Sequence, residues 1–154
     1  MVIPSIFCVQ IVNAEMGNPK LTISSAVTPN EIRRGETGTL TVVVKEISGD
    51  DWAKDVSIEP IPPEGCIISP PFEGIGRINK SASSTFPFSI IVPETANIGS
   101  YTGTIKMKYY ETGALNIGIY GPYNSSNSFP FTIAKGTGTV SISCLLYTSP
   151  SPRD

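Results

Sequence analysis

The residues that carry most enzyme chemistry are scarce in this sequence. Its 154 residues include no histidine, so the Ser-His-Asp and Cys-His arrangements are excluded. Of the three cysteines, Cys8 and Cys144 lie near the two ends and Cys66 is the internal one. Without a histidine beside it, Cys66 is expected to be a half-buried structural thiol rather than an activated nucleophile. The sequence therefore predicts a protein that is not an enzyme and that needs no cofactor.

Three aspartates are the only candidates for a metal site. Asp50, Asp51 and Asp55 carry carboxylate oxygens, and calcium takes about six to eight oxygen ligands. Their spacing lacks the alternating carboxylates of a known calcium-binding loop. Aspartate also favours turns, because its side chain bonds to nearby backbone groups. A plain turn is therefore the favoured interpretation, and a calcium site is the alternative.

Four aromatic residues are candidates for contacts with a ligand. Aromatic faces stack on apolar ring surfaces such as those of sugars, and exposed aromatics mark binding sites. The candidates are Trp52, Tyr110, Tyr120 and Tyr123. The alternative is that Tyr120 and Tyr123 hold a long loop in place.

Two sequons are candidate sites for N-glycosylation in a host that exports proteins through such machinery. They begin at Asn79 (Asn-Lys-Ser) and at Asn124 (Asn-Ser-Ser). Both fall in segments that we predict to be loops, where acceptor asparagines are accessible.

Alternating apolar and polar residues predict strands along most of the chain. In one example, Leu40, Val42 and Val44 alternate with the residues between them, which gives a strand one core face and one solvent face. Proline, glycine and aspartate clusters predict the turns between strands. No segment shows a sustained helical stripe. The predicted strands cover residues 21–24, 40–45, 56–58, 86–92, 101–109 and 129–134, and the predicted turns cover 29–35, 48–51, 62–65, 93–99 and 121–128.

This pattern predicts an all-β domain, an immunoglobulin-like antiparallel β-sandwich of about seven strands. The weakly patterned segment 66–83 is expected to cross between the sheets, with a short edge strand at Ile67 and Ile68. The alternation places Ile105 and Tyr109 in the core and Tyr110 in water. Val42 and Ile90 are also expected in the core, whereas Thr104 and Lys106 should face solvent. Tyr101 occupies the position of a corner tyrosine, whose hydroxyl bonds to nearby backbone.

The two ends of the sequence do not belong to this domain. Residues 1–14 (MVIPSIFCVQIVNA) are uncharged and end in the small-residue spacing that signal peptidase accepts. Because a basic start is missing, we interpret them as a truncated signal peptide; a first strand or a short anchor is the alternative. The segment is too short to span a membrane, which takes roughly 20 apolar residues. Residues 144–154 (CLLYTSPSPRD) match one translated frame of a transposase-type sequencing adapter, so we interpret them as an artefact rather than a natural linker-like tail.

The sequence between these ends predicts one complete domain, residues 15–135. Residues 138–143 (GTVSIS) resemble residues 20–25 (KLTISS), so 136–143 is either a linker or the first strand of a second repeat. The chain has 11 basic and 13 acidic residues, a net charge of −2. That mild acidic balance argues against a nucleic-acid partner, which needs clustered lysine and arginine.

Several motifs follow one another in a characteristic order. The run TPNEIRRGE at 28–36 precedes the valine-rich strand at 40–44, and residues 48–56 (SGDDWAKDV), PEG at 63–65 and PETANIGSYTG at 93–103 come after it. In this order the motifs resemble those of CARDB-like repeats, which are found in archaeal surface-layer-associated proteins and beside bacterial glycosidases. Two features depart from the pattern: Cys66 stands where those repeats have tryptophan, and residues 115–128 are longer than their last hairpin.

The resemblance implies a non-catalytic structural or adhesion module of a longer, secreted or cell-surface protein. Its partners would be neighbouring domains of the same chain or surface-layer proteins, with glycans as further candidates. No membrane span is expected within these residues. The alternative is a carbohydrate-binding or accessory module attached to an extracellular enzyme. We expect no hydrolytic activity and at most weak sugar binding that depends on the exposed aromatics.

Overall fold

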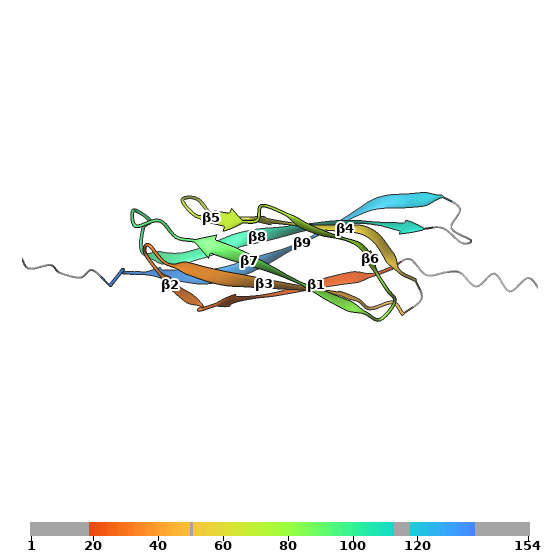
Figure 1. Cartoon of the computed structure of the whole chain (residues 1–154), viewed down its shortest axis with the longest axis horizontal. Helices are drawn as coiled ribbons and strands as arrows, with labels where there is room; N and C mark the ends of the chain where they lie inside the picture. Colours follow the sequence, from red (N-terminus) through yellow and green to blue (C-terminus); the bar gives the residue numbers. More distant parts are fainter. Residues whose placement is uncertain (1–18, 50, 113–117, 138–154) are drawn as a thin grey trace, which may run out of the picture.

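The computed structural model describes residues 19–49, 51–112 and 118–137. These residues form two β-sheets packed face to face into an elongated sandwich (Figure 1). The first sheet has the order β1-β3-β7-β5, and the second has the order β2-β9-β8-β4-β6. The first contains β1 (Leu21–Thr28), β3 (Thr37–Glu46), β7 (Ser83–Ile91) and β5 (Ile67–Ser69); the second contains β2 (Glu31–Arg33), β9 (Ile119–Ala134), β8 (Gly99–Thr112), β4 (Ala53–Ile61) and β6 (Glu73–Ile78).

The predicted all-β sandwich is confirmed, but the described residues form nine strands rather than about seven. The two strands missing from the prediction are β2 and β6. Strand β2 has three residues within a proline- and glycine-bounded turn, and only its central Ile32 is buried. Strand β6 is a sheet edge in which only Ile78 is buried, so it shows no alternation. The predicted edge strand at Ile67 is β5, and the chain crosses from it to the second sheet.

One strand pair departs from the antiparallel arrangement. After β1 the chain passes through Pro29 and Asn30 into the second sheet, where β2 pairs in parallel with β9. The paired residues are Glu31 with Thr132, Ile32 with Ile133, and Arg33 with Ala134. Ile32 thereby enters the core, where it is fully buried.

The turn predicted at 121–128 is wrong, because these residues belong to β9. They pair with β8, for example Asn124 with Lys108 and Ser126 with Lys106. Asparagine, serine and glycine resemble a turn in sequence, but here polar side chains meet the edge of β1. The Asn127 side-chain amide donates to the Ile23 carbonyl at 2.9 Å. Hydrogen bonds to β1 therefore hold this part of β9 in place of apolar contacts. For that reason it lacks the alternating apolar residues that predict a strand.

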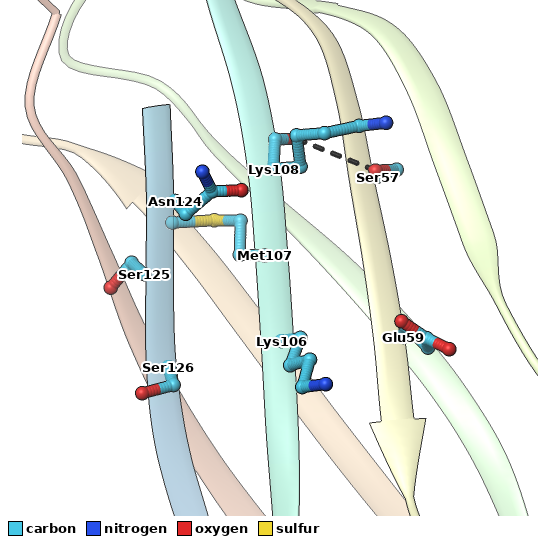
Figure 2. A pocket seen from close by; sticks show the side chains of 8 residues that line it. All are labelled: Ser57, Glu59, Lys106, Met107, Lys108, Asn124, Ser125 and Ser126. Carbon is cyan, nitrogen blue, oxygen red and sulfur yellow. Dashed lines mark hydrogen bonds between the residues drawn. The ribbon is translucent and has the colours of Figure 1, made fainter. Parts of the chain in front are cut away.

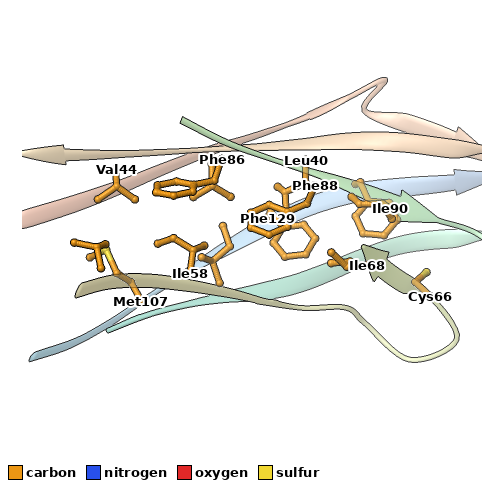
Figure 3. Close-up of a cluster of buried hydrophobic side chains, with 14 of the residues drawn as sticks. Leu40, Val44, Ile58, Cys66, Ile68, Phe86, Phe88, Ile90, Met107 and Phe129 are labelled. Carbon is orange, nitrogen blue, oxygen red and sulfur yellow. The ribbon is translucent and has the colours of Figure 1, made fainter. Parts of the chain in front are cut away.

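The core lies between the sheets and is rich in aromatic and β-branched residues (Figure 3). The predicted core residues Val42, Ile90 and Ile105 are fully buried. Tyr109 is also buried, whereas Tyr110 is partly exposed on the opposite face. Cys66 is buried rather than half-buried, and burial raises the pKa of its thiol. These positions agree with the predicted register of the strands.

Two residues of the 93–103 motif have clear structural roles. The Tyr101 hydroxyl donates to the Asn97 carbonyl at 2.9 Å, as expected for a corner tyrosine. Gly103 lies opposite Phe129, and a Cβ atom on Gly103 would fall 2.0 Å from the Phe129 ring. Glycine is therefore required there, because it leaves room for a buried aromatic ring.

Candidate functional site

A groove on the outer face of the second sheet is the candidate site. It has a volume of about 560 Å³. The side chains that rise from three neighbouring strands around it are polar (Figure 2). They are Ser57 and Glu59 from β4, Lys106 and Lys108 from β8, and Asn124 and Ser126 from β9. Ser125 of β9 and the buried Met107 of β8 also line the groove.

Strand register places these side chains in two rows across the sheet. Lys106 pairs with Glu59 on one side and with Ser126 on the other. Lys108 likewise pairs with Ser57 and with Asn124. Residues two apart on a strand share a face, so the rows lie next to each other. The central strand β8 thus supplies the cations, and its neighbours supply hydroxyl, amide and carboxylate groups.

The two lysines give the middle of the groove a positive charge. Both are exposed, and Figure 2 shows their side chains reaching over β8 toward β4. Within the described residues, neither ammonium group has an ion-pair partner. Ser57 is held by a hydrogen bond from its hydroxyl to the Lys108 carbonyl at 3.5 Å. The groove therefore offers unpaired cations beside oriented hydrogen-bonding groups.

Tyr110 extends this face beyond Lys108. It pairs with Lys54 of β4, which also points away from the core. On the other side of Tyr110, β9 has a bulge at Gly121, which has a φ of 123°. A Cβ atom on Gly121 would lie 3.3 Å from the Tyr110 ring. Because glycine has no side chain there, this edge of the ring is left uncovered.

The four predicted aromatics do not form one platform. Trp52 is partly exposed directly before β4, and the Arg77 guanidinium lies over its ring, 4.6 Å from the centroid. Tyr120 is exposed and pairs with Glu111. The Tyr123 ring stacks on buried Tyr109 at 5.3 Å between centroids. Tyr110 is thus the aromatic candidate that shares the groove's face and strand.

Tyr123 has an internal role that its sequence position did not reveal. Its hydroxyl donates to a carboxylate oxygen of buried Glu111 at 2.8 Å. That hydrogen bond, together with partial burial, raises the pKa of Tyr123. Burial likewise raises the pKa of Tyr109, whose hydroxyl donates to the Pro19 carbonyl at 3.2 Å. Both phenols stay neutral and contribute to packing near the N-terminal end of the domain.

The aspartates occupy different environments. Asp50 lies outside the described residues. Asp51 is buried, and its Oδ1 accepts a hydrogen bond from the Trp52 amide at 2.7 Å. Asp55 is exposed at a bulge of β4 with a φ of 48°, a conformation that aspartate tolerates. Across the described part of the chain, no group of three or more histidine, cysteine, aspartate or glutamate side chains could hold a metal ion.

The two sequons also differ. Asn79 is exposed in the turn after β6, as expected, and its side-chain oxygen accepts a hydrogen bond from Arg77. Asn124 is not in a loop, because it is an exposed residue within β9. The predicted loop location of Asn124 is wrong for the same reason as the turn at 121–128, and its glycosylation stays a prediction. A sugar on Asn124 would stand in the groove itself.

Sequence reasoning placed Lys106 in water but assigned no site to it. Lys108, Ser57, Glu59 and Ser126 were missed as well. The alternation of β8 could have indicated this site, because it exposes Lys106 and Lys108, which lie two residues apart on one face of the strand. Their neighbours could not be identified, because pairing with β4 and β9 was not predicted at residue level.

No family model and no curated protein matches the chain. Among solved structures, it is similar to native alpha-2-macroglobulin from Escherichia coli, covering 77% of this chain and 17% of that one, with 8% identity and a TM-score of 0.54. It is also similar to a CARDB domain from Pyrococcus furiosus in complex with di-metal ions (12% identity, 76% and 90% coverage, TM-score 0.48). A third similar structure is a family 123 glycoside hydrolase from Clostridium perfringens (13% identity, 77% and 28% coverage, TM-score 0.47).

The chain thus spans 17% of the macroglobulin structure and 28% of the hydrolase structure. At 8% identity, the macroglobulin likeness shows the fold alone. Together with the two sheets, it defines the fold of the chain as a β-sandwich. Among the described residues, none of the elements is a helix long and apolar enough to cross a membrane.

Proposed function

We propose that this domain is a non-catalytic, load-bearing module of a longer secreted or cell-surface protein. The observation that carries the proposal is the path of the chain through the sandwich. The described chain enters β1 at one end of the long axis, the N-terminal pole, and leaves β9 at the opposite end, the C-terminal pole (Figure 1). A domain with this geometry joins its neighbours in line, so tension along the protein passes through its whole length.

Tension between the two ends of the domain passes through the parallel pair of β2 and β9. When the two ends are pulled apart, β2 is drawn toward the N-terminal pole and β9 toward the C-terminal pole. The force then shears the hydrogen bonds of the pair together instead of opening them one after another. Two of these bonds are from the Arg34 amide to the Ala134 carbonyl at 3.1 Å and from the Thr132 amide to the Asn30 carbonyl at 2.9 Å.

Features of the sequence support placement outside the cell. Residues 1–14, which lie outside the described residues, have the character of a signal peptide. The ordered motifs of residues 28–103 resemble CARDB-like repeats, and such repeats adjoin one another in surface proteins. We therefore assign the domain to a chain of similar modules that spaces or displays other domains. Surface-layer proteins and neighbouring modules are the partners that this role implies.

The load-bearing role predicts a specific effect of removing one backbone donor. The Arg34→Pro variant lacks the amide that donates to Ala134, whereas Arg34→Ala lacks only the side chain. In single-molecule force spectroscopy through the chain ends, Arg34→Pro should unfold at a lower force than the wild type. Arg34→Ala should unfold at the wild-type force. Equal forces for all three proteins would contradict the role assigned to the β2–β9 pair.

A further inference from the structure

We propose that the groove over β4, β8 and β9 binds a segment of an acidic polysaccharide whose sugar rings carry carboxylate groups. The inference goes beyond the mechanical role, which does not depend on it. It rests on the charge of the groove, on the kinds of groups that line it and on the aromatic ring at its end.

Charge selects an anionic ligand. Lys106 and Lys108 stand two residues apart on the outer face of the central strand, and Lys54 adds a third cation beside Tyr110. Glu59 is the one carboxylate among the groove residues named above. The cations lie about 7 Å apart along the strand, at a rise of about 3.4 Å per residue. A linear chain with regularly spaced carboxylates would lie along β8 and meet them in turn.

The lining favours a sugar over a peptide or a nucleic acid. Strand β8 is hydrogen-bonded to β4 and β9 on its two sides, so an extended peptide cannot add to it as a further strand. The outward side chains around the lysines are hydroxyl, amide and carboxylate groups, which suit sugar hydroxyls. Three lysines are too few for a nucleic-acid surface, which depends on many phosphate contacts.

Tyr110 supplies the ring contact that sugars use. It follows Lys108 on the same face, and the missing side chain at Gly121 leaves an edge of its ring open. The apolar face of one sugar ring can pack against it while the carboxylates of the next rings reach the lysines. Because the groove is open and its charges stay hydrated, we expect a dissociation constant of about 0.1–1 mM.

The test uses the 154-residue chain and isothermal titration with a short oligogalacturonate. The matched control ligand is the same oligosaccharide with its carboxyl groups methyl-esterified, which keeps the rings and removes the charge. The acid should bind, and its ester should bind at least about tenfold more weakly. Added salt should weaken the binding of the acid. Poly-glutamate tests the competing class of ligand, an acidic polypeptide.

Variants locate the contact. Replacing Lys106 and Lys108 together by alanine should weaken binding about tenfold, and Tyr110→Ala should weaken it about fivefold without changing the charge. Lys45→Ala, an exposed lysine on the other sheet, should bind like the wild type. Unchanged thermal midpoints will show that the variants are folded. The proposal is overturned if the acid fails to bind at about 10 mM, if the ester or poly-glutamate binds equally well, or if the groove variants bind normally.

Discussion

Replacing Glu46 with glutamine should lower the free energy of unfolding at pH 7 by about 3 kcal/mol. Glu46 ends β3 and is fully buried. Its Oε1 accepts hydrogen bonds from the Lys20 amide at 3.3 Å and the Ser48 amide at 2.7 Å, and also from the Ser48 hydroxyl. Its Oε2 accepts from the Gly49 and Ser81 amides, both at 2.9 Å. Hydrogen bonds to this one carboxylate therefore connect the start of the domain with two turns at the N-terminal pole.

The magnitude follows from the pKa of this carboxyl group. Burial alone would raise the pKa, but the hydrogen bonds from Ser48, Ser81 and Gly49 outweigh burial and lower it from 4.5 to about 2. Folding thus favours the ionised form by about 3 kcal/mol, which corresponds to a pKa of about 2 in place of 4.5. Because the folded pKa is the lower one, this stability is present above about pH 4.5. It decreases as the pH falls and is lost below about pH 2.

Chemical denaturation between pH 2 and 7 measures both effects. The difference between wild type and Glu46→Gln should be largest at pH 7 and should shrink as the pH approaches 2. Glu59→Gln is the matched control, because Glu59 is an exposed carboxylate on β4; it should change stability by less than about 0.5 kcal/mol. A pH-independent difference, or an equal effect of the two substitutions, would contradict the role of Glu46.

The Ile105→Ala variant should lose about 2–5 kcal/mol of unfolding free energy, the range for truncating a buried aliphatic side chain. Ile105 is fully buried in the centre of β8, between Pro60 of β4 and Asn127 of β9. A smaller side chain leaves a cavity that the surrounding sheets cannot close. Thr104 and Lys106 precede and follow it on the solvent face, so their alanine variants should cost less than about 0.5 kcal/mol.

Thermal or denaturant unfolding of the three variants distinguishes the two faces of β8. A large loss for Thr104→Ala or Lys106→Ala with little for Ile105→Ala would place the strand one residue out of register, because such a shift exchanges the faces.

Strict alternation made β8 the easiest element to predict. Every second residue from Gly103 to Tyr109 is buried and the residues between them are exposed, so period and burial agree. The same reasoning failed where polar residues point inward. In β9, Asn127 faces the edge of β1 and bonds to the Ile23 carbonyl, and no apolar residue marks the part of the strand from 124 to 128. Pairing with a distant edge cannot be identified from local composition.

Long-range pairing also explains what was missed in the candidate site. Alternation alone predicts that Lys106 and Lys108 face water. Their placement beside Ser57 and Asn124 depends on the register of β8 with β4 and β9. Glu46 is a second case, since its Ser81 donor lies 35 residues away in sequence. Aromatic residue type was a poor guide, because Tyr123 is used in packing and Trp52 is covered by Arg77.

The direction of pulling gives the most direct test of the load-bearing role. One protein is attached through cysteines introduced at Lys20 and Thr137, so that force runs from pole to pole. A second is attached at Lys20 and Ile119, both at the N-terminal pole, so that force runs across the sandwich. We predict that the pole-to-pole geometry needs the higher unfolding force, because it shears the hydrogen bonds of β2 and β9 together. An equal or lower force in that geometry would contradict the proposal that this domain bears load along its chain.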